Sequence, residues 1–246
     1  MVTSIYLVIN CAQGEMQIVL GSREGVVYAQ SMHVPGRAMK YMAPGIEHGL
    51  KLLNLGPEEL AGIACVTGPG SFTGIRMSLA HSFGLSCTHN IPMAGISYLQ
   101  ALALGPASLL HGRLWVLVHS RQDQVYAQSF LVPELRCATP ARNISLDHLK
   151  DMLSAEKGPA YLLGSGVRRI SGRLENNSCF VIPESWDIPL PQSLLTLALG
   201  AQWKNELPEP FYLRTSEAEE NLSIIAAERG MDIQQAMKLL AGKQNP

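Results

Sequence analysis

The stretch Thr67-Gly68-Pro69-Gly70-Ser71-Phe72-Thr73-Gly74-Ile75-Arg76 stands between an apolar run and a helical pattern. The apolar run, Ile63 to Val66, predicts a short buried strand. The residues from Thr73 to about Thr88 predict a helix. The glycines permit backbone angles that other residues avoid, and a serine or threonine at the helix start can cap it. The sequence therefore predicts a strand, a tight turn and a helix in direct succession.

This turn has two possible roles. The N–H groups at the start of the helix could hold an anion. A P-loop is excluded, because the spacing from Gly68 to Gly74 is wrong and Ile75 stands where the lysine should follow. From the residues alone, a purely structural turn and an anion site both remain open.

Outward from this stretch, the pattern alternates strands and helices. Three strands come first, and apolar residues at helical spacing follow from Met39 to Leu53. After the central helix come a short strand, Met93-Ala94, and a helix from Ser97 to Leu104. The first three strands are expected at Ile5 to Ile9, Met16 to Leu20 and Val26 to Met32.

The second half repeats the opening. Strands are expected at Leu114 to Val118 and Val125 to Val132, again with a polar end residue and a short loop between them. A helix at Leu146 to Leu153, short strands near 161–163 and 180–182, and a helix at Leu194 to Trp203 follow. The boundary is expected near Gly105-Pro106. We therefore predict lobes at 1–105 and 106–214 and a tail at 215–246, with helices near Ser216 to Glu220 and Met231 to Leu240.

Composition excludes several classes of protein. The chain has 246 residues, 19 Lys plus Arg and 20 Asp plus Glu, for a net charge of −1. A strongly basic nucleic-acid binder is not expected, and the small cluster Arg168, Arg169 and Arg173 reads as solvated surface. Charged residues are 16% against roughly 25% in average chains. This scarcity of charge indicates that part of the surface meets a partner.

Two helix faces are candidates for that partner surface. Gly74, Ser78 and Ser82 form a stripe of small residues on the central helix. The preceding helix offers Met39, Met42 and Ile46. Burial of these residues inside the chain is the equally open alternative.

Catalytic and metal-binding patterns are not found. The seven histidines form neither H-E-x-x-H nor an H-x-x-x-H pair, so no metal site is predicted. Ser71 lacks the G-x-S-x-G context of a hydrolase nucleophile. The five cysteines are odd in number and far apart, which indicates reduced core thiols in a cytoplasmic protein. No run is long enough to span a membrane.

The sequence resembles the TsaB family, also called YeaZ. The signature is Gly-Pro-Gly-Ser-Phe-Thr-Gly-Ile-Arg at 68–76. Ile91 to Leu99 resembles the family segment "IPVVGVSSLEAL". Arg121 to Tyr126 resembles "DARxGEVY", and Pro210 to Arg214 resembles "PxYLR". The likeness runs in order from the first strand to about Arg214.

The resemblance implies an α/β, two-lobed actin/Hsp70-like (ribonuclease H-like) fold with duplicated βββαβα units. It also implies a non-catalytic subunit that pairs through its first lobe with TsaD and supports TsaD in making threonylcarbamoyladenosine next to the tRNA anticodon. TsaE would join the pair, and the isolated chain would form a homodimer through the same surface. ATP or ADP and metal are expected in the partner subunits or at the shared interface, not in this chain. Contact with tRNA is expected only through the complex.

Three departures from the family pattern bear on function. Asn10-Cys11 stands where the family has Asp-Thr, His119-Ser120-Arg121 replaces "DAR", and 36–40 lacks the family's "HSE". An uncharged Asn is a poor partner for magnesium. A self-sufficient actin-like ATPase or phosphotransferase and a glycoprotease-like peptidase are the alternative functions.

Overall fold

A computed structural model describes residues 4–156, 158–170 and 179–213. The predicted tail at 215–246 with its two expected helices, Arg173 and Arg214 lie outside the described residues. In the part described, no helix is long and apolar enough to cross a membrane.

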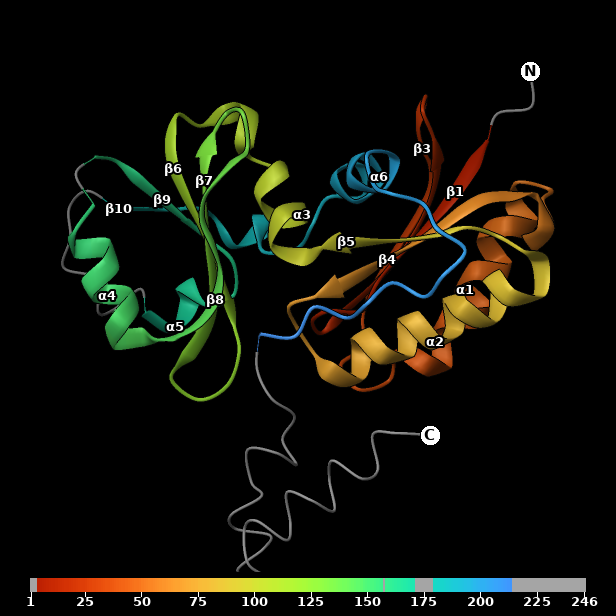
Figure 1. Cartoon of the computed structure of the whole chain (residues 1–246), viewed down its shortest axis with the longest axis horizontal. Helices are drawn as coiled ribbons and strands as arrows, with labels where there is room; N and C mark the ends of the chain where they lie inside the picture. Colours follow the sequence, from red (N-terminus) through yellow and green to blue (C-terminus); the bar gives the residue numbers. More distant parts are fainter. Residues whose placement is uncertain (1–3, 157, 171–178, 214–246) are drawn as a thin grey trace, which may run out of the picture. The chain divides into compact units, whose positions relative to one another are not determined.

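The first sheet has five strands in the order β3-β2-β1-β4-β5 (Figure 1). β1 pairs antiparallel with β2 and parallel with β4. These strands span β1 Ile5–Asn10, β2 Glu15–Ser22, β3 Gly25–His33, β4 Leu60–Gly68 and β5 Met93–Ser97. The helices that belong to it are α1 Ala38–Leu52, α2 Phe72–His89 and α3 Tyr98–Leu104, with a 3-10 turn, η1, at Pro57–Glu59.

The second sheet repeats this plan with the order β10-β9-β6-β7-β8. β6 pairs antiparallel with β7 and parallel with β9, as β1 does with β2 and β4. Its elements are η2 Ala107–Leu109, β6 Gly112–His119, β7 Gln124–Val132, β8 Arg136–Ser145, α4 Leu146–Ser154, β9 Ala160–Leu163, α5 Val167–Ile170 and β10 Cys179–Val181. The duplicated βββαβα unit predicted from the sequence is confirmed.

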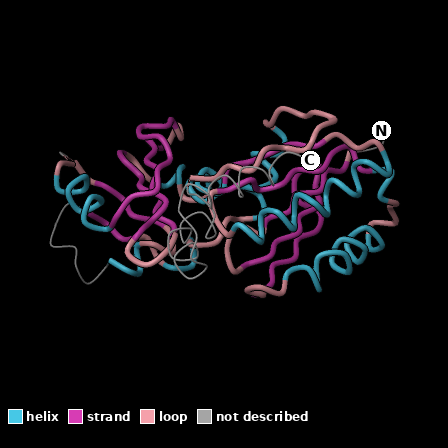
Figure 2. Tube along the Cα trace, turned by 60° about the horizontal axis from the view of Figure 1, so that its bottom comes forward, coloured by secondary structure: helices cyan, strands magenta, loops and turns pink. Residues whose placement is uncertain are grey.

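The two long helices of the first lobe cover the same face of the sheet (Figure 2). Ile9 lies opposite Ile18 on β2 and opposite Cys65 on β4, and opposite side chains share a face. Ser82 of α2 contacts the Cys65 thiol at 3.0 Å. A side chain at Gly45 of α1 would meet Ile18. The inward faces of α1 and α2 are therefore occupied by their own sheet.

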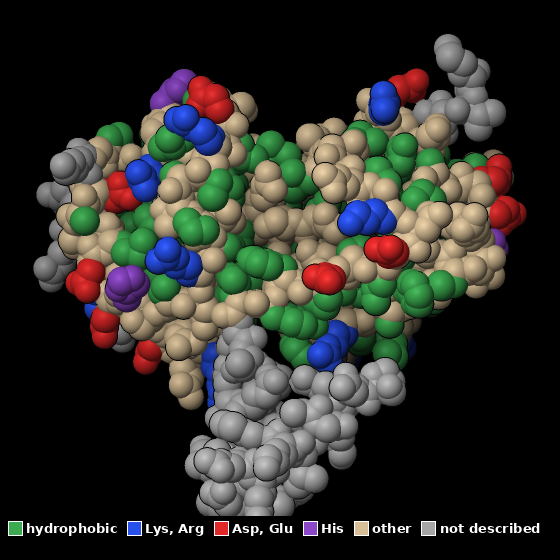
Figure 3. All heavy atoms as spheres, in the orientation of Figure 1, with side chains coloured by type: hydrophobic (Ala, Val, Ile, Leu, Met, Phe, Trp, Pro, Cys, Tyr) green, Lys and Arg blue, Asp and Glu red, His purple; other side chains and the backbone are tan. Residues whose placement is uncertain are grey.

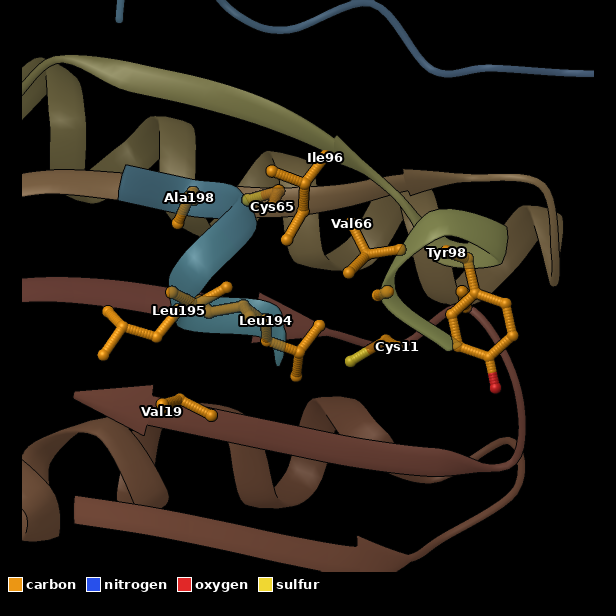
Figure 4. Packing of buried hydrophobic residues seen from close by; sticks show 14 of the residues in the cluster. Cys11, Val19, Cys65, Val66, Ile96, Tyr98, Leu194, Leu195 and Ala198 are labelled. Atoms are coloured by element: carbon orange, nitrogen blue, oxygen red, sulfur yellow. The ribbon is translucent and has the colours of Figure 1, made fainter. Parts of the chain in front are cut away.

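The other face of the first sheet is covered from the far end of the chain. After η4 (Glu184–Trp186), helix α6 (Pro191–Leu199) packs on β2, β3 and β5. Its Leu194, Leu195 and Ala198 are fully buried, and Figure 4 shows them beside Val19 and Val66. Burying each leucine contributes about 1.5–3 kcal/mol.

The last residues of the predicted second lobe, 106–214, therefore pack on the first sheet. Helix α6 contacts β1, β2, β3 and β5 of the first sheet, and it also packs on α3. After α6, Trp203 packs on Tyr6 with ring centroids 5.1 Å apart, and Lys204 bridges to Met93 of β5. The chain crosses from the first sheet to the second between α3 and β6, at 105–111, and returns to the first sheet with α6.

Candidate functional site

The signature loop connects β4 to α2 and lies against the β1–β2 loop. A Cβ atom at Gly70 would collide with the backbone oxygen of Ala12, and one at Gly74 with that of Cys11. The Ser71 N–H donates to the Ala12 oxygen at 2.6 Å. Only residues without a Cβ allow two backbones to approach this closely.

The start of α2 is capped from within the chain. The Ser71 Oγ accepts the Gly74 N–H at 3.2 Å, as the sequence predicts. The carbonyl oxygens of Cys11 and Ala12 border the same helix end. Carbonyl oxygens there repel an anion, so the geometry favours the structural turn over the anion site. Pro69 follows a cis peptide bond, and Thr73 is exposed.

Arg76 joins the signature to the segment at 210–213. Its guanidinium carbon lies 3.7 Å from the centre of the Phe72 ring, and its Nε donates to the Tyr212 hydroxyl at 3.0 Å. Phe72 and Tyr212 stack with centroids 4.7 Å apart. The Phe211 N–H donates to the Thr67 oxygen at 2.8 Å, which extends the contact to β4. The two segments of family-like sequence thus form one surface cluster, which sequence reasoning missed.

The small-residue stripe faces inward. Ser78 and Ser82 are fully buried, and the Ser78 hydroxyl donates to the Ile75 oxygen at 2.9 Å. Met42 and Ile46 are buried as well, and Gly74 packs on Cys11. The prediction that these five residues line a subunit interface is wrong, because they fill the space between the helices and their own sheet. Met39 is the exception, with 70% of its surface exposed.

The exposed face of α2 has the composition of a contact surface. Its exposed residues are Thr73, Arg76, Ala80, Phe83, Gly84, Cys87 and Thr88. Phe83 is 40% exposed and stands between two small residues, with open space beside Gly84. Arg76 carries the one charge of this set and is tied to Tyr212. A helix that faces water is normally polar on its outer side, so this face is unusual.

The exposed side of α1 carries more charged residues than that of α2, mixed with apolar ones. Met39 and Leu52 are 70% and 61% exposed, and Ala43 is exposed between charged residues. The orientation drawn in Figure 3 likewise shows scattered charges with hydrophobic side chains at the surface between them. The outer faces of α1 and α2, defined by Met39, Ala43, Ala80, Phe83 and Gly84, are therefore the candidate partner surface.

The exit of β1 does not fit a magnesium ion. Asn10 is 1% exposed, and its amide donates to the Gln17 Oε1 at 2.8 Å. Its amide oxygen accepts the Ala12 N–H at 3.0 Å. Gln17 in turn donates to the Pro189 oxygen at 2.9 Å. The side chain is thus engaged at both ends and offers no carboxylate to a hard cation.

The corresponding turn of the second lobe carries His119, Ser120 and Arg121. Burial, with the Arg169 charge as a smaller cause, lowers the pKa of His119. Within the described residues, the buried Ser120 Oγ makes no hydrogen bond, and no three His, Cys, Asp or Glu side chains gather as metal ligands. Arg168 is no free cation, because it pairs with Asp187 at 2.9 Å and donates to the Ile182 oxygen.

Comparisons with known proteins agree with this geometry. A family model described as "TsaD: tRNA N6-adenosine threonylcarbamoyltransferase" matches residues 37–161, half of the chain. "tRNA threonylcarbamoyladenosine biosynthesis protein TsaB" of Bacillus subtilis is 26% identical over 204 residues, which cover 80% of this chain and 86% of that protein. The protein of the same name from Escherichia coli is 24% identical over 206 residues, covering 79% and 88%. The chain belongs to the TsaB family.

Solved structures of YeaZ extend the agreement to the fold. YeaZ from Pseudomonas aeruginosa superposes with a TM-score of 0.71 at 18% identity, covering 85% of this chain and all of that one. A second structure, of an uncharacterized protein with similarity to peptidase YEAZ from the same organism, gives a TM-score of 0.74 at 20% identity, covering 86% and 100%. The TsaB family and its two-lobed actin-like fold, both predicted from the sequence, are confirmed.

Proposed function

We propose that this chain is a non-catalytic subunit of the tRNA threonylcarbamoyl transferase. It pairs with TsaD and activates TsaD for modification of the adenosine next to the anticodon. Support comes from the names of the TsaB relatives and the match to the TsaD family model. One observation carries the pairing: the exposed face of α2 presents Phe83 between small residues and has a single, already engaged charge.

The pairing surface is the outer face of α1 and α2. Ala80 and Gly84 let a partner helix approach closely, and Met39 and Phe83 provide apolar area to bury. TsaE joins this pair, and ATP, ADP and metal belong to the partner subunits or the shared interface. With a net charge of −1, this chain alone attracts the tRNA phosphates weakly, so the tRNA is held by the complex. The complex works in the cytoplasm.

Two other functions receive less support from the site. A self-sufficient ATPase or phosphotransferase needs a cation ligand at the exit of β1, where the Asn10 amide is engaged. A peptidase built on Ser71 needs a free hydroxyl, but that oxygen caps α2. No base is hydrogen-bonded to Ser71 in the part of the chain that the structure describes.

Co-purification with TsaD of the same organism tests the pairing. Ala80→Arg and Phe83→Asp place a charge in the proposed interface, so we expect each to weaken the complex by at least about tenfold. Leu109→Asp is the matched control, because Leu109 is 69% exposed and lies outside α1 and α2. Undiminished binding of Ala80→Arg and Phe83→Asp would overturn this surface.

A further inference from the structure

Arg76 is held in position on the exposed face of α2 by two aromatic side chains. Its guanidinium carbon lies 3.7 Å from the centre of the Phe72 ring, and its Nε donates to the Tyr212 hydroxyl at 3.0 Å. A free surface arginine loses side-chain freedom when it enters an interface, and that loss weakens binding. Because Phe72 and Tyr212 already restrict Arg76, this side chain has less freedom to lose.

The hydrogen bond to Tyr212 engages only the Nε of Arg76. Within the described residues, Nη1 and Nη2 have no acceptor, and no Asp or Glu pairs with this side chain. These groups form a planar fork that fits the two oxygens of a carboxylate. Gly74, two positions earlier, faces the Cys11 oxygen, so Arg76 points away from the carbonyl groups beside the helix start. A carboxylate can therefore reach Arg76 from the outer side of α2.

The exposed charges around Arg76 are separated by sign. β3 and β4 run in the same direction as β1, so α1 and α2 begin at the same edge of the sheet. Arg37 and Lys40 are exposed at the start of α1, and Arg76 is exposed near the start of α2. Glu58 and Glu59 are exposed in η1, which contacts α2 and precedes β4, so they lie at the opposite end. The partner surface is thus basic at one end and acidic at the other.

We propose that the partner protein places the carboxylate of an Asp or Glu side chain against the Arg76 guanidinium. This inference rests on the proposed pairing with TsaD and names the chemistry that recognises and orients TsaD. Glu47 and Lys51 lie between the two charged ends and pair with each other. A protein with acidic groups at one end fits this surface in one orientation. An RNA fits it poorly, because its evenly spaced phosphates would also meet Glu58 and Glu59.

Binding to purified TsaD of the same organism, at low and at high salt, tests the proposal. Arg76→Gln removes the charge, so we expect it to weaken the complex by about tenfold or more at low salt. Salt screens exposed charges, so the same substitution should matter less at high salt. Arg76→Lys keeps the charge without the planar fork and should bind with intermediate affinity. The matched control is Arg23→Gln, which should bind like the wild type because Arg23 is exposed in the β2–β3 turn, outside α1 and α2.

Tyr212→Phe tests whether holding the guanidinium matters. This substitution removes the hydroxyl that accepts from Nε and leaves the charge of Arg76 in place. The side chain then regains freedom in the unbound chain, so we expect binding to TsaD to weaken by about threefold. Unchanged affinity would contradict the role of Tyr212 in positioning Arg76.

Two results would overturn the carboxylate contact. One is an Arg76→Gln variant that binds TsaD as tightly as the wild type, and weaker tRNA binding by that complex would assign Arg76 to RNA instead. The other is a loss of binding that is equal at low and high salt, which indicates a structural role for Arg76. If Arg76→Gln binds normally while Phe83→Asp does not, the pairing with TsaD stands and only this contact is wrong. If the wild type does not bind TsaD, the proposed function fails as well.

Discussion

At the residue scale, glycine is required at Gly68 and at Gly70 for different physical reasons. The sequence predicts unusual backbone angles at the glycines of this loop, and the structure shows a positive φ, +131°, at Gly68. Gly70 is required because the Ala12 backbone lies where its Cβ would be. The sequence predicted the turn correctly. It could not predict the contact with the β1–β2 loop, because that loop is far from Gly70 in the sequence.

Gly70→Val tests that reason. The added side chain must displace the Ala12 backbone, so we expect a loss of about 1–3 kcal/mol in the free energy of unfolding. Gly84→Ala is the matched control, since nothing lies within 4 Å of its Cβ position. Removing a helical glycine there should stabilise the chain by about 0.5–1 kcal/mol. Chemical denaturation measures both, and equal effects of the two variants would contradict the close contact.

The Arg76 cluster shows the same limit of sequence reading. Arg76 and Tyr212 are 136 positions apart, and each belongs to a segment that resembles the family. Their separate motifs were visible in the sequence, but the hydrogen bond between them was not. A cationic and an aromatic residue form such a pair only when the fold brings them together.

At the element scale, α2 was predicted with nearly correct ends, and the small-residue face named as a candidate interface is the buried one. Small and apolar residues occur all around this helix, so its periodicity does not distinguish inside from outside. The buried serines are explained by the sheet beneath them: the Cys65 thiol donates to the Ser82 oxygen, and burial raises the pKa of Cys65 to about 12. Cys11 is buried as well, whereas Cys87 and Cys137 are exposed, so the core-thiol prediction is wrong for those two.

Substitutions on the buried face of α2 should lower the free energy of unfolding much more than substitutions on its exposed face. Ser82→Arg forces a charge into the core, so we expect about 3 kcal/mol or more of destabilisation. Ser82→Ala removes one hydrogen bond and should cost about 1 kcal/mol. Ala80→Arg, on the exposed face, should stay within about 0.5 kcal/mol of wild type. Thermal unfolding checks the series, and a normally stable Ser82→Arg variant would place this face outside.

Strand β8 is an element that the sequence did not reveal. Its ten residues contain Pro140 and mix polar with small side chains, so they lack the alternation of a half-buried strand. The strand pairs antiparallel with the free edge of β7. The Ser129 hydroxyl donates to the Thr139 Oγ1 across this pair at 2.8 Å. Duplication of the first lobe was the one signal that could have predicted it.

At the scale of the whole molecule, the sequence predicted the duplicated sheets. It did not predict that the chain returns to the first sheet after the second. The two sheets have the same strand order, and each begins with the strand–turn–strand pattern seen in the sequence. A helix was predicted at Leu194 to Trp203, near the observed α6, but a helical pattern does not say which sheet the helix covers. It covers the first, and one hydrophobic cluster contains residues of both sheets.

The most direct test is tRNA modification with purified components. TsaD, TsaE, threonylcarbamoyl-adenylate, ATP and unmodified tRNA are combined with and without this chain, and threonylcarbamoyladenosine is measured by mass spectrometry. We predict no product from this chain alone, little from TsaD and TsaE without it, and full modification when all are present. Modification by this chain alone, or equal modification without it, would contradict its role as a non-catalytic activating subunit.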